Sequence, residues 1–512
     1  MNTNIQNVLI RYINYLFLLV VLMITQNELL NYETIEWDIP SYLVASQDIK
    51  NFHIPNQNQW ESKGPIFMYL YYLISFISGK SFVIFKIIND LLLFTISIIL
   101  YKVIHFKTNQ KYLALSSSLF FILFMSQPWA ISGYSEIYSL LFLSYSYLLI
   151  LKFRYSKNVF IYIGILFSIS TLINQGTVIF LLPFLVSEYF RNNQKKFFNN
   201  SLRTLFGFLI PHLIFLIIYF MSGLIDIYFA TFVTIPLGYI GANYSTFYEL
   251  RVFSRELFEY NLYLYISFLT LFFFTFKKSF ENHSFRFKTT LTNVDILNVL
   301  CGLIFYFVGS HNYYHHLIFF IFYISISVGN IFYDKQKQIF CFFILLSVFT
   351  IFQTSFEKSY NNLRNFESIQ NEYPLYKLSK LIDSNFDDND YTILALDYNL
   401  ILFYLDKPNF AYIVHPSNHF EDFIVDVLSD LDKVEKNHIE SLINSEPDVI
   451  ICNPRLIIRG EPIDLRSKKF NCEVSDYKKN YIKLDTLTYK NDENLNFYYD
   501  PYKEIRVFIK QK

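Results

Sequence analysis

Charged residues are scarce in this chain: they make up 17% of its 512 residues, and the formal net charge is zero. Soluble globular domains carry roughly 25% charged residues, so the composition disfavours a water-soluble globule. A neutral chain also lacks the long-range positive field that attracts nucleic acid, and no basic stripe interleaved with aromatic residues stands outside the short loops between apolar runs. No nucleic acid is therefore predicted as a partner.

Cysteine is rare as well. The four cysteines include no CxxC pair, and no His/Cys spacing typical of zinc ligands occurs, so no structural zinc site is predicted. Cys301 and Cys341 lie in apolar runs, whereas Cys452 and Cys472 lie in the polar C-terminal part. The latter two would form a disulfide in an oxidising compartment or remain two thiols, and the sequence leaves both alternatives open.

Long apolar runs are what the chain has in abundance. A helix needs roughly 20 apolar residues to cross about 30 Å of hydrocarbon. Runs near that length begin near Val8, Phe82, Tyr112, Ile137, Phe160, Val178, Leu202, Leu262, Val294, Leu317 and Ile339. We predict a mainly α fold, a polytopic membrane helical bundle of about 11 spans over residues 1–356. The first run has no small-residue cleavage site behind it and is interpreted as a retained anchor.

Residues 65–79 form a further apolar stretch, which as a helix reaches only about 22 Å and is too short to cross. If it lies along the interface and the N-terminus is cytoplasmic, the basic loops fall on the inner side. Their charges include Lys102, Lys107, Lys111, Lys152, Arg154, Lys157, Arg191, Lys195, Lys196, Arg203, Lys277, Lys278, Arg286, Lys288, Lys335 and Lys337. Both short runs flanking residues 174–176 are kept as crossings for the same reason. This predicts a multi-pass protein of the cell (inner or plasma) membrane.

The pattern changes from residue 357 onward. Short β-rich runs alternate with an amphipathic stretch at 420–442, and these runs cover residues 391–396, 410–414 and 448–452. Residues 481–512 are interpreted as irregular strands with a turn at 491–494. We therefore predict a C-terminal α/β domain over residues 357–512, which an odd number of crossings places on the extracytoplasmic side.

The first of three predicted outer loops, at residues 26–81, carries the strongest site candidate; the others are 126–136 and 222–260. Pro40 suits the first turn of a helix, so Asp38 lies near a helix N-terminus, where the helix dipole keeps a carboxylate ionised. Such a carboxylate can accept a proton from a hydroxyl. The alternative is a solvated helix cap. Lys63 in the same loop is alternatively an ordinary interface lysine.

Further ionisable groups are expected on the same side of the membrane, where polar residues are costly unless they are used. Glu61 belongs to the first loop, and Glu136 lies at the outer mouth of a span, where it is alternatively a snorkelling edge residue. Arg251 and Arg255 in the third loop could clamp a phosphate, with ion pairing inside the loop as the default interpretation.

Histidines cluster before a late span, with His315 and His316 following Tyr314. Tyrosine and histidine are common at membrane interfaces, and no carboxylate stands beside them in the sequence. The pattern therefore favours interfacial residues over a metal site, and no metal ligand is assigned. A divalent metal remains an alternative, and no other cofactor is indicated.

The first loop is similar to that of the glycosyltransferase-C superfamily, specifically to polyprenyl-phosphate-sugar-dependent transferases of the protein O-mannosyltransferase and aminoarabinose-transferase kind. The residues that carry the resemblance are Asp38, Tyr42, Ala45, the run His53-Ile54-Pro55 and the run Glu61-Ser62-Lys63-Gly64-Pro65. Glu136 falls where such enzymes keep a second acidic residue, and Tyr314-His315-His316 resembles their His-Tyr-rich motif. The chain departs from the pattern at Ile39, where the family often has another acid.

The resemblance implies an outward-facing cavity that a lipid-phosphate sugar donor enters from the bilayer. Asp38 would be the general base that deprotonates an acceptor hydroxyl, with inversion at the anomeric carbon. Lys63, Arg251 or Arg255 would stabilise the leaving phosphate. Glu61 and Glu136 would orient hydroxyls or anchor a divalent ion. The remaining substrate-binding candidates are Tyr42, His315 and His316.

The predicted function is therefore an integral membrane glycosyltransferase that moves a sugar from a polyprenyl-phosphate donor to a lipid, glycan or protein acceptor. The absence of a nucleotide-sugar motif or phosphate-binding loop agrees with a lipid-linked donor. The alternative is a transporter or flippase of lipid-linked saccharides. Transporters often have paired halves with spans broken at matching positions, and none is found in this sequence.

Overall fold

The computed structural model describes residues 3–33, 37–126, 133–153, 156–240, isolated positions between 251 and 277, and residues 294–308, 314–332, 335–350, 356–387, 390–454, 456–458, 461–462, 472–490 and 502–511. The chain divides into two compact units. The first comprises Met1–Leu30, Lys86–Phe215 and Tyr239–Phe366, and the second comprises Asn31–Phe85, Leu216–Gly238 and Glu367–Lys512. Each unit is described by itself.

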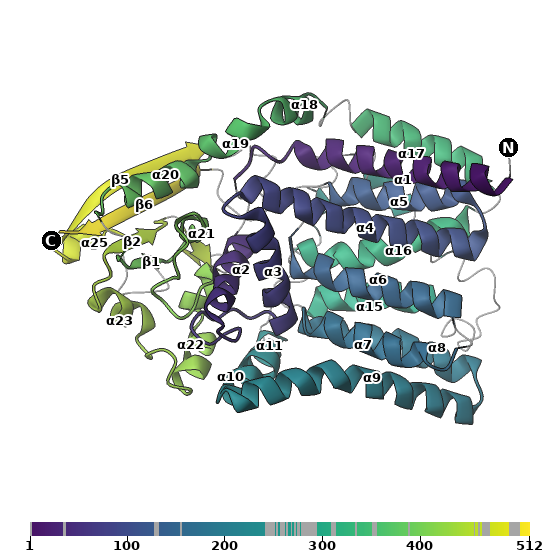
Figure 1. The fold of residues 1–512 in the computed structure, drawn as a ribbon, viewed down its shortest axis with the longest axis horizontal. Helices are drawn as coiled ribbons and strands as arrows, with labels where there is room; N and C mark the ends of the chain where they lie inside the picture. The colour runs from purple at the N-terminus through teal and green to yellow at the C-terminus, as the bar shows by residue number, and fades with distance from the viewer. Residues whose placement is uncertain are drawn as a thin grey trace. The chain divides into compact units, whose positions relative to one another are not determined.

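The first unit is a helical bundle, and Figure 1 shows several of its helices side by side. Its first half consists of α1 (Thr3–Asn27), α4 (Phe82–Thr108), α5 (Lys111–Met125), α6 (Ser135–Phe153), α7 (Val159–Thr171), the 3-10 turn η3 (Gln175–Phe180), α8 (Leu181–Arg191) and α9 (Gln194–Met221). Its second half consists of α15 (Val294–Val308), the turn η5 (Tyr314–Leu317), α16 (Ile318–Ile331), α17 (Gln336–Thr350) and α18 (Phe356–Arg364). Helices α4 and α9 each continue into the second unit.

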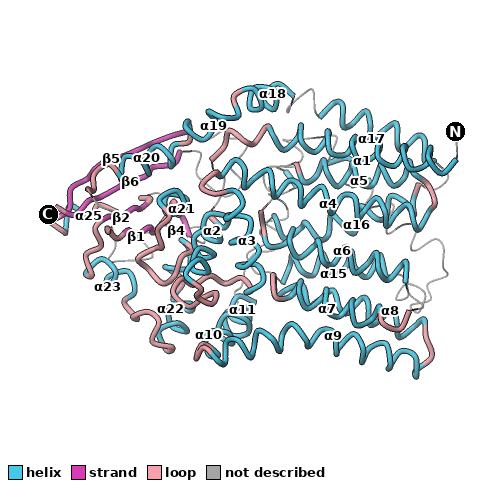
Figure 2. The backbone as a smooth tube through the Cα atoms, viewed as in Figure 1, coloured by secondary structure: helices cyan, strands magenta, loops and turns pink. Residues whose placement is uncertain are grey.

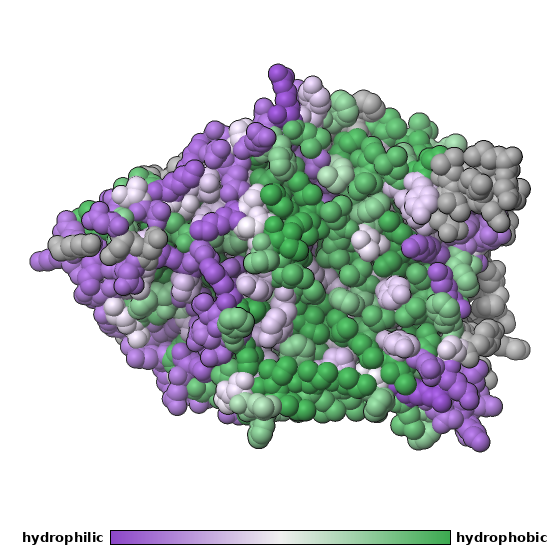
Figure 3. All heavy atoms as spheres, in the orientation of Figure 1, coloured by the Kyte–Doolittle hydropathy of each residue, from purple (hydrophilic) through white to green (hydrophobic). Residues whose placement is uncertain are grey.

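Among the described residues, three helices are long and apolar enough to cross a membrane: α4, α6 and α9. The other apolar helices of the bundle are shorter over the residues whose side chains are described, with α1 represented by Tyr12–Asn27, and they coincide with most of the runs from which eleven spans were predicted. The run near Leu262 lies outside the described residues except for isolated positions. Figure 3 shows apolar side chains over much of the visible face of these helices, as contact with lipid requires. The mainly helical class is confirmed, and the span count stays a prediction.

Helices α7 and α9 cross at two glycines. A Cβ atom on Gly164 would lie 2.1 Å from the backbone oxygen of Thr204, and one on Gly207 would lie 2.1 Å from the backbone oxygen of Ile161. Side chains cannot be accommodated at such distances, so the small residues allow the two backbones to touch, as is common between membrane helices. This contact holds α7, which ends three residues before Asn174, a hydrogen-bond donor to Glu136.

The second unit combines the first loop with the C-terminal part of the chain. From the first loop it takes α2 (Asp38–Gln47), the 3-10 turn η1 (Asp48–Asn51) and α3 (Pro65–Ser78), and from the middle of the chain α10 (Ile225–Phe229) and the π-helical turn η4 (Ala230–Thr234). Helix α11 (Ile235–Ile240) begins in this unit. The C-terminal helices are α19 (Phe366–Glu372), α20 (Pro374–Asp383), α21 (Leu400–Leu405), the turn η8 (Pro416–Phe420), α22 (Asp422–Ser429), α23 (His438–Asn444) and α25 (Val474–Tyr477).

A four-stranded sheet lies in this unit, with strand order β1-β2-β6-β5; Figure 2 shows its strands in magenta. Strand β1 (Ile393–Ala395) is parallel to β2 (Val449–Cys452), whereas β6 (Tyr502–Lys510) is antiparallel to both β2 and β5 (Tyr481–Lys490). Strands β3 (Ile457–Ile458) and β4 (Glu461–Pro462) form a separate pair. Cys452 and Cys472 are joined in a disulfide, which resolves the alternative that the sequence left open.

The strand predictions hold in part. Residues 391–396 and 448–452 contain β1 and β2, but 410–414 is not a strand of the sheet: Ile413 makes only an isolated bridge to Trp60. The reason is a competing partner, because the Trp60 N–H donates to the Tyr412 oxygen over 2.6 Å and the Val414 N–H donates to the Trp60 oxygen over 3.2 Å. The amphipathic stretch at 420–442 is divided between α22 and α23.

The last part of the chain is more regular than predicted. Strands β5 and β6 pair over their length, with one register shift between Lys483 and Asp485, and the turn predicted at 491–494 lies outside the described residues. Long paired strands form here because their partner is sequence-adjacent, and β6 is also paired on its other edge with β2.

The first loop is hydrogen-bonded to the C-terminal part within the second unit. The Glu33 carboxylate accepts from the N–H groups of Leu375 and Tyr376, over 2.7 and 2.9 Å, at the start of α20. The Asn399 amide donates to Ser41 over 3.1 Å. Trp60 is fully buried, and its indole N–H donates to Thr231 over 3.0 Å. These contacts position α2, and therefore Asp38, against the C-terminal segment.

Candidate active site

Asp38 is the first residue of α2, as the position of Pro40 predicted. The preceding residue, Trp37, makes no side-chain capping bond, so the first-turn carboxylate is the negative group that faces the positive helix end. The Asp38 side chain is 14% exposed. It is neither deeply buried nor a freely solvated cap.

His415 is the residue that holds Asp38. Its Nε2 atom lies 2.6 Å from Asp38 Oδ1, and its Nδ1 atom lies 3.0 Å from the hydroxyl of Ser417. The imidazole also meets the Trp37 ring edge to face, with ring centroids 5.6 Å apart. His415 stands directly before Pro416, which opens the turn η8, so the C-terminal segment delivers this side chain to the start of α2.

Glu61 lies in the same electrostatic cluster and is 1% exposed. One carboxylate oxygen, Oε1, accepts from the N–H and the hydroxyl of Ser62, over 2.8 and 2.9 Å. Within the described part of the chain, no hydrogen-bond partner reaches the other oxygen, Oε2, which is also buried. A buried oxygen without a donor favours the protonated acid, or a ligand that donates to it.

Burial and neighbouring charges set the pKa values here. Burial raises the pKa of Glu61 above 4.5, and although the charge of His415 opposes this, the net shift is upward. For His415, burial lowers the pKa, but the hydrogen bond to Asp38 and the charges of Glu61 and Asp38 outweigh it, and the pKa is raised above 6.5. The site therefore favours a protonated imidazole between two acidic groups.

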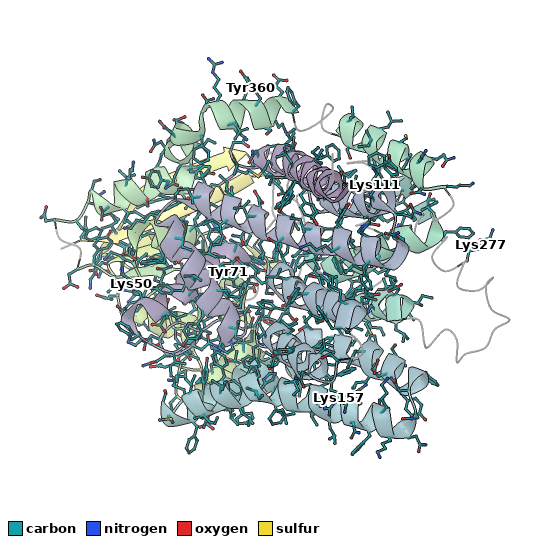
Figure 4. The ribbon with its side chains drawn as sticks, turned by 45° about the vertical axis from the view of Figure 1, so that its right-hand side comes forward. Lys50, Tyr71, Lys111, Lys157, Lys277 and Tyr360 are labelled. Carbon is teal, nitrogen blue, oxygen red and sulfur yellow. A yellow bond between two sulfur atoms is a disulfide. The ribbon has the colours of Figure 1, made fainter. Side chains whose placement is uncertain are left out.

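Lys63 and Tyr42 lie in this unit as well. The Lys63 ammonium is 5.8 Å from the centroid of the Tyr42 ring, and its charge acts on both Glu61 and His415. Tyr42 is buried against Phe67 and Tyr71, with ring centroids 5.0 and 5.7 Å apart; Figure 4 labels Tyr71. The second unit thus brings together Asp38, Tyr42, Glu61 and Lys63 from the predicted site and adds His415.

A second cluster lies in the first unit, where Glu136, His315 and His316 come together. One ligand atom from each of the three lies within 4.8 Å of the others, and Glu136 and His315 are buried. The Asn174 amide donates to Glu136 Oε1 over 2.8 Å, and the Ser135 hydroxyl donates to Oε2 over 3.2 Å. Two histidines and a carboxylate are ligands that suit a divalent cation such as zinc, and Asn174 and Ser135 hold this carboxylate by hydrogen bonds.

This cluster supplies the carboxylate that the sequence did not place beside the histidines. Glu136 precedes them by almost 180 positions, and only the packing of α6 against α16 and the turn η5 brings it to them. The predicted cations Arg251 and Arg255 belong to the same unit and are exposed. Tyr314 lies in η5, and its side chain lies outside the described part of the structure.

Two residues of these clusters were not predicted from the sequence. His415 follows a short apolar run in the C-terminal segment, with no motif to connect it to a residue almost 380 positions earlier. Asn174 was noted only as a break between two apolar runs. The one signal that the sequence offered for Asn174 is its place between two apolar runs, where polar residues are costly unless they are used.

No family model matches the chain, and no curated protein matches its sequence. The crystal structure of ArnT from Cupriavidus metallidurans bound to undecaprenyl phosphate matches with a TM-score of 0.59 and 10% identity, over 96% of this chain and 97% of ArnT. This chain has the ArnT fold. Apo ArnT matches with a TM-score of 0.56 and 10% identity, over 97% of each chain.

A more distant match is the Archaeoglobus fulgidus oligosaccharyltransferase in complex with Zn and sulfate, with a TM-score of 0.47 and 14% identity, over 92% of this chain and 72% of that one. The likeness to ArnT extends over nearly the whole of both chains, so the ArnT fold includes both compact units. At the level of the fold, the chain is thus similar to ArnT.

Proposed function

We propose that this protein is an integral membrane glycosyltransferase that transfers a sugar from a polyprenyl-phosphate donor to an acceptor hydroxyl. The observation that carries the proposal is the cluster of Asp38, Glu61 and Lys63 in a chain with the ArnT fold. The structure of ArnT with undecaprenyl phosphate makes a lipid-linked phosphate the natural class of donor.

Asp38 is the general base in this proposal. It takes the proton of the acceptor hydroxyl as that oxygen attacks the anomeric carbon, and the bond to the lipid phosphate breaks on the opposite face, so that the configuration inverts. Positioned general bases contribute typically about 10²–10⁴-fold. The place of Asp38 in the first turn of α2 supports the role, because the helix dipole favours the ionised carboxylate.

Lys63 is the predicted phosphate-binding cation whose charge acts on Glu61 and His415 in the Asp38 cluster, and we assign it to the leaving phosphate. Arg251 and Arg255 remain candidates for the same task. Tyr42 carries the Lys63 ammonium on its ring face, so it positions that charge. Glu61 is suited to a sugar or acceptor hydroxyl, since its buried Oε2 lies ready for a donor.

Glu136, His315 and His316 are the residues that would hold a divalent cation. When bound, such an ion would supply Lewis-acid stabilisation of negative charge on a phosphate oxygen. Asn174 and Ser135 would keep the Glu136 carboxylate oriented toward it.

The proposal places both the first loop and the C-terminal segment on the extracytoplasmic side. The disulfide between Cys452 and Cys472 supports this, because disulfides persist in oxidising compartments and are rare in the cytosol. The acidic first loop and the basic loops predicted for the other side agree with the same orientation.

The test uses the full chain in proteoliposomes with a polyprenyl-phosphate sugar, and it scores the release of free polyprenyl phosphate. Asp38→Asn should lower the release rate by at least about 10²-fold. Asp406→Asn is the control, since it alters an exposed carboxylate of the same unit, and its rate should stay within about twofold. Unchanged release in Asp38→Asn would remove Asp38 from the mechanism, and movement of intact donor across the vesicle without release would identify a flippase.

A further inference from the structure

We infer that His415 is a positioning residue for the base Asp38, so that the C-terminal segment completes the acid-base site of the first loop. The inference rests on the proposed function for its kinetic consequences. Its structural basis is the 2.6 Å contact between His415 Nε2 and Asp38 Oδ1, in which a carboxylate accepts and the imidazole donates.

Both ring nitrogens of His415 are occupied. Nε2 bonds Asp38, and Nδ1 bonds the Ser417 hydroxyl over 3.0 Å. No ring nitrogen remains to take a proton from a substrate hydroxyl, so His415 acts through Asp38 and is not itself the base. Its side chain is 10% exposed and its ring packs on Trp37, which limits it to one orientation.

The groups around His415 favour a protonated imidazole in a fixed orientation. Asp38 comes from α2, Glu61 and Lys63 come from the first loop, and His419 comes from the turn η8; these are the ionisable groups that act on it or on which it acts. Two acidic groups face the ring and one ammonium opposes them. A cation at this place orients the Asp38 carboxylate and favours its ionised form.

His415 contributes an N–H donor and a positive charge to Asp38, and two substitutions can distinguish these contributions. His415→Gln keeps an N–H donor for Asp38 and loses the charge. His415→Phe keeps a ring against Trp37 and loses both the donor and the charge. We expect kcat to fall about 10²-fold in His415→Phe, because a reacting group displaced by about 1 Å costs that much, and several-fold less in His415→Gln.

The pH profile distinguishes positioning from a merely structural role. Because a positive neighbour favours the ionised carboxylate, the acid limb of kcat/KM should move to higher pH in both variants. The KM for the lipid donor should stay within about twofold, since His415 is not assigned to the phosphate. Unchanged kcat and an unmoved acid limb in both variants would overturn the inference.

The matched control is the contact between Lys50 and Asp406, labelled at Lys50 in Figure 4. It also joins the first loop to the C-terminal segment, over 2.5 Å, but it is exposed. Asp406→Asn should leave kcat and the pH profile within about twofold of the parent, as exposed ion pairs contribute little. If Asp406→Asn lowered kcat as much as His415→Phe, the effect would come from the attachment of the C-terminal segment to the first loop. That result would also overturn the inference.

A double-mutant cycle ties the effect to Asp38. In an Asp38→Asn background, His415→Phe should cost less than about twofold, because its partner is already lost. The full loss in that background would contradict the inference and leave the transferase proposal intact.

If no variant, including the parent, releases polyprenyl phosphate, the proposed function fails. The His415–Asp38 pair is then tested by thermal unfolding, because a histidine with a raised pKa stabilises the folded chain below pH 6.5 and loses that contribution as the pH rises through its folded value. This decline should be smaller in His415→Gln, and an equal decline in both would overturn the pair itself.

Discussion

Gln59 and Asn409 exchange two hydrogen bonds although they lie 350 positions apart in the chain. The Gln59 amide donates to the Asn409 carbonyl oxygen over 3.0 Å, and the Asn409 N–H donates to Gln59 Oε1 over 2.9 Å. Both residues are buried. The Gln59 side chain and the Trp60 backbone of the first loop thus bond residues 409–414, and the Phe410 N–H donates to Ile393 of β1 over 2.8 Å.

Gln59→Ala should therefore destabilise the second unit. The substitution leaves the buried Asn409 N–H without its acceptor, which costs about 1–3 kcal/mol. Hydrogen exchange of residues 409–414 should accelerate in the variant. Gln47→Ala is the control, since Gln47 makes its hydrogen bonds to Leu43 and Ser75 within the first loop; equal exchange in the parent and Gln59→Ala would contradict the expectation.

The paired histidines of the C-terminal segment predict a loss of stability in acid. His419 Nδ1 lies 3.0 Å from His438 Nε2. Burial lowers the pKa of His438 from 6.5 to about 4, and burial together with the charges of His438 and His415 lowers the pKa of His419 well below 6.5. Between pH 6.5 and about 4, these histidines bind protons in the unfolded chain but stay neutral in the folded chain. The free energy of unfolding therefore falls as the pH falls.

Each of these two groups contributes at most about 1.4 kcal/mol per pH unit in that window. Hydrogen exchange of α22 and α23, corrected for the intrinsic pH dependence, should accelerate between pH 7 and pH 5 by this effect. His438→Gln removes one titrating group and should reduce the slope. Protection that is the same at both pH values would show that the pair is not held neutral.

The cluster of Glu136, His315 and His316 predicts metal binding that depends on all three residues. The purified protein, dialysed against zinc and then against buffer, should retain metal in elemental analysis, whereas Glu136→Gln and His316→Ala should lose it. Asn174→Ala should weaken the affinity about 10–100-fold, because it removes the donor that orients Glu136. His419→Gln is the control histidine, and equal metal content in all variants would mean that this cluster binds no ion.

Local patterns gave correct expectations where the deciding forces act between near neighbours. Pro40 placed Asp38 at the start of α2, and apolar runs of sufficient length marked the helices of the bundle. The run at 410–414 failed because its Tyr412 and Val414 backbone groups bond to Trp60, and its link to the sheet is the Phe410 N–H, which donates to Ile393 of β1. Strand propensity depends on the partner that a strand finds, and that partner lay some 350 positions away.

The sequence by itself determined that the chain is rich in apolar helices, that Asp38 begins a helix in the first loop, and that Glu61 and Lys63 lie on the same loop. Hydropathy and helix signals depend on residues a few positions apart, so they can be recognised from the sequence without the tertiary structure. Only the tertiary structure decided that His415 reaches Asp38, that Glu136 meets His315 and His316, and that the first loop belongs to the same compact unit as the C-terminal segment. These are contacts between distant parts of the chain, and they follow from packing and buried hydrogen bonds that no local pattern encodes.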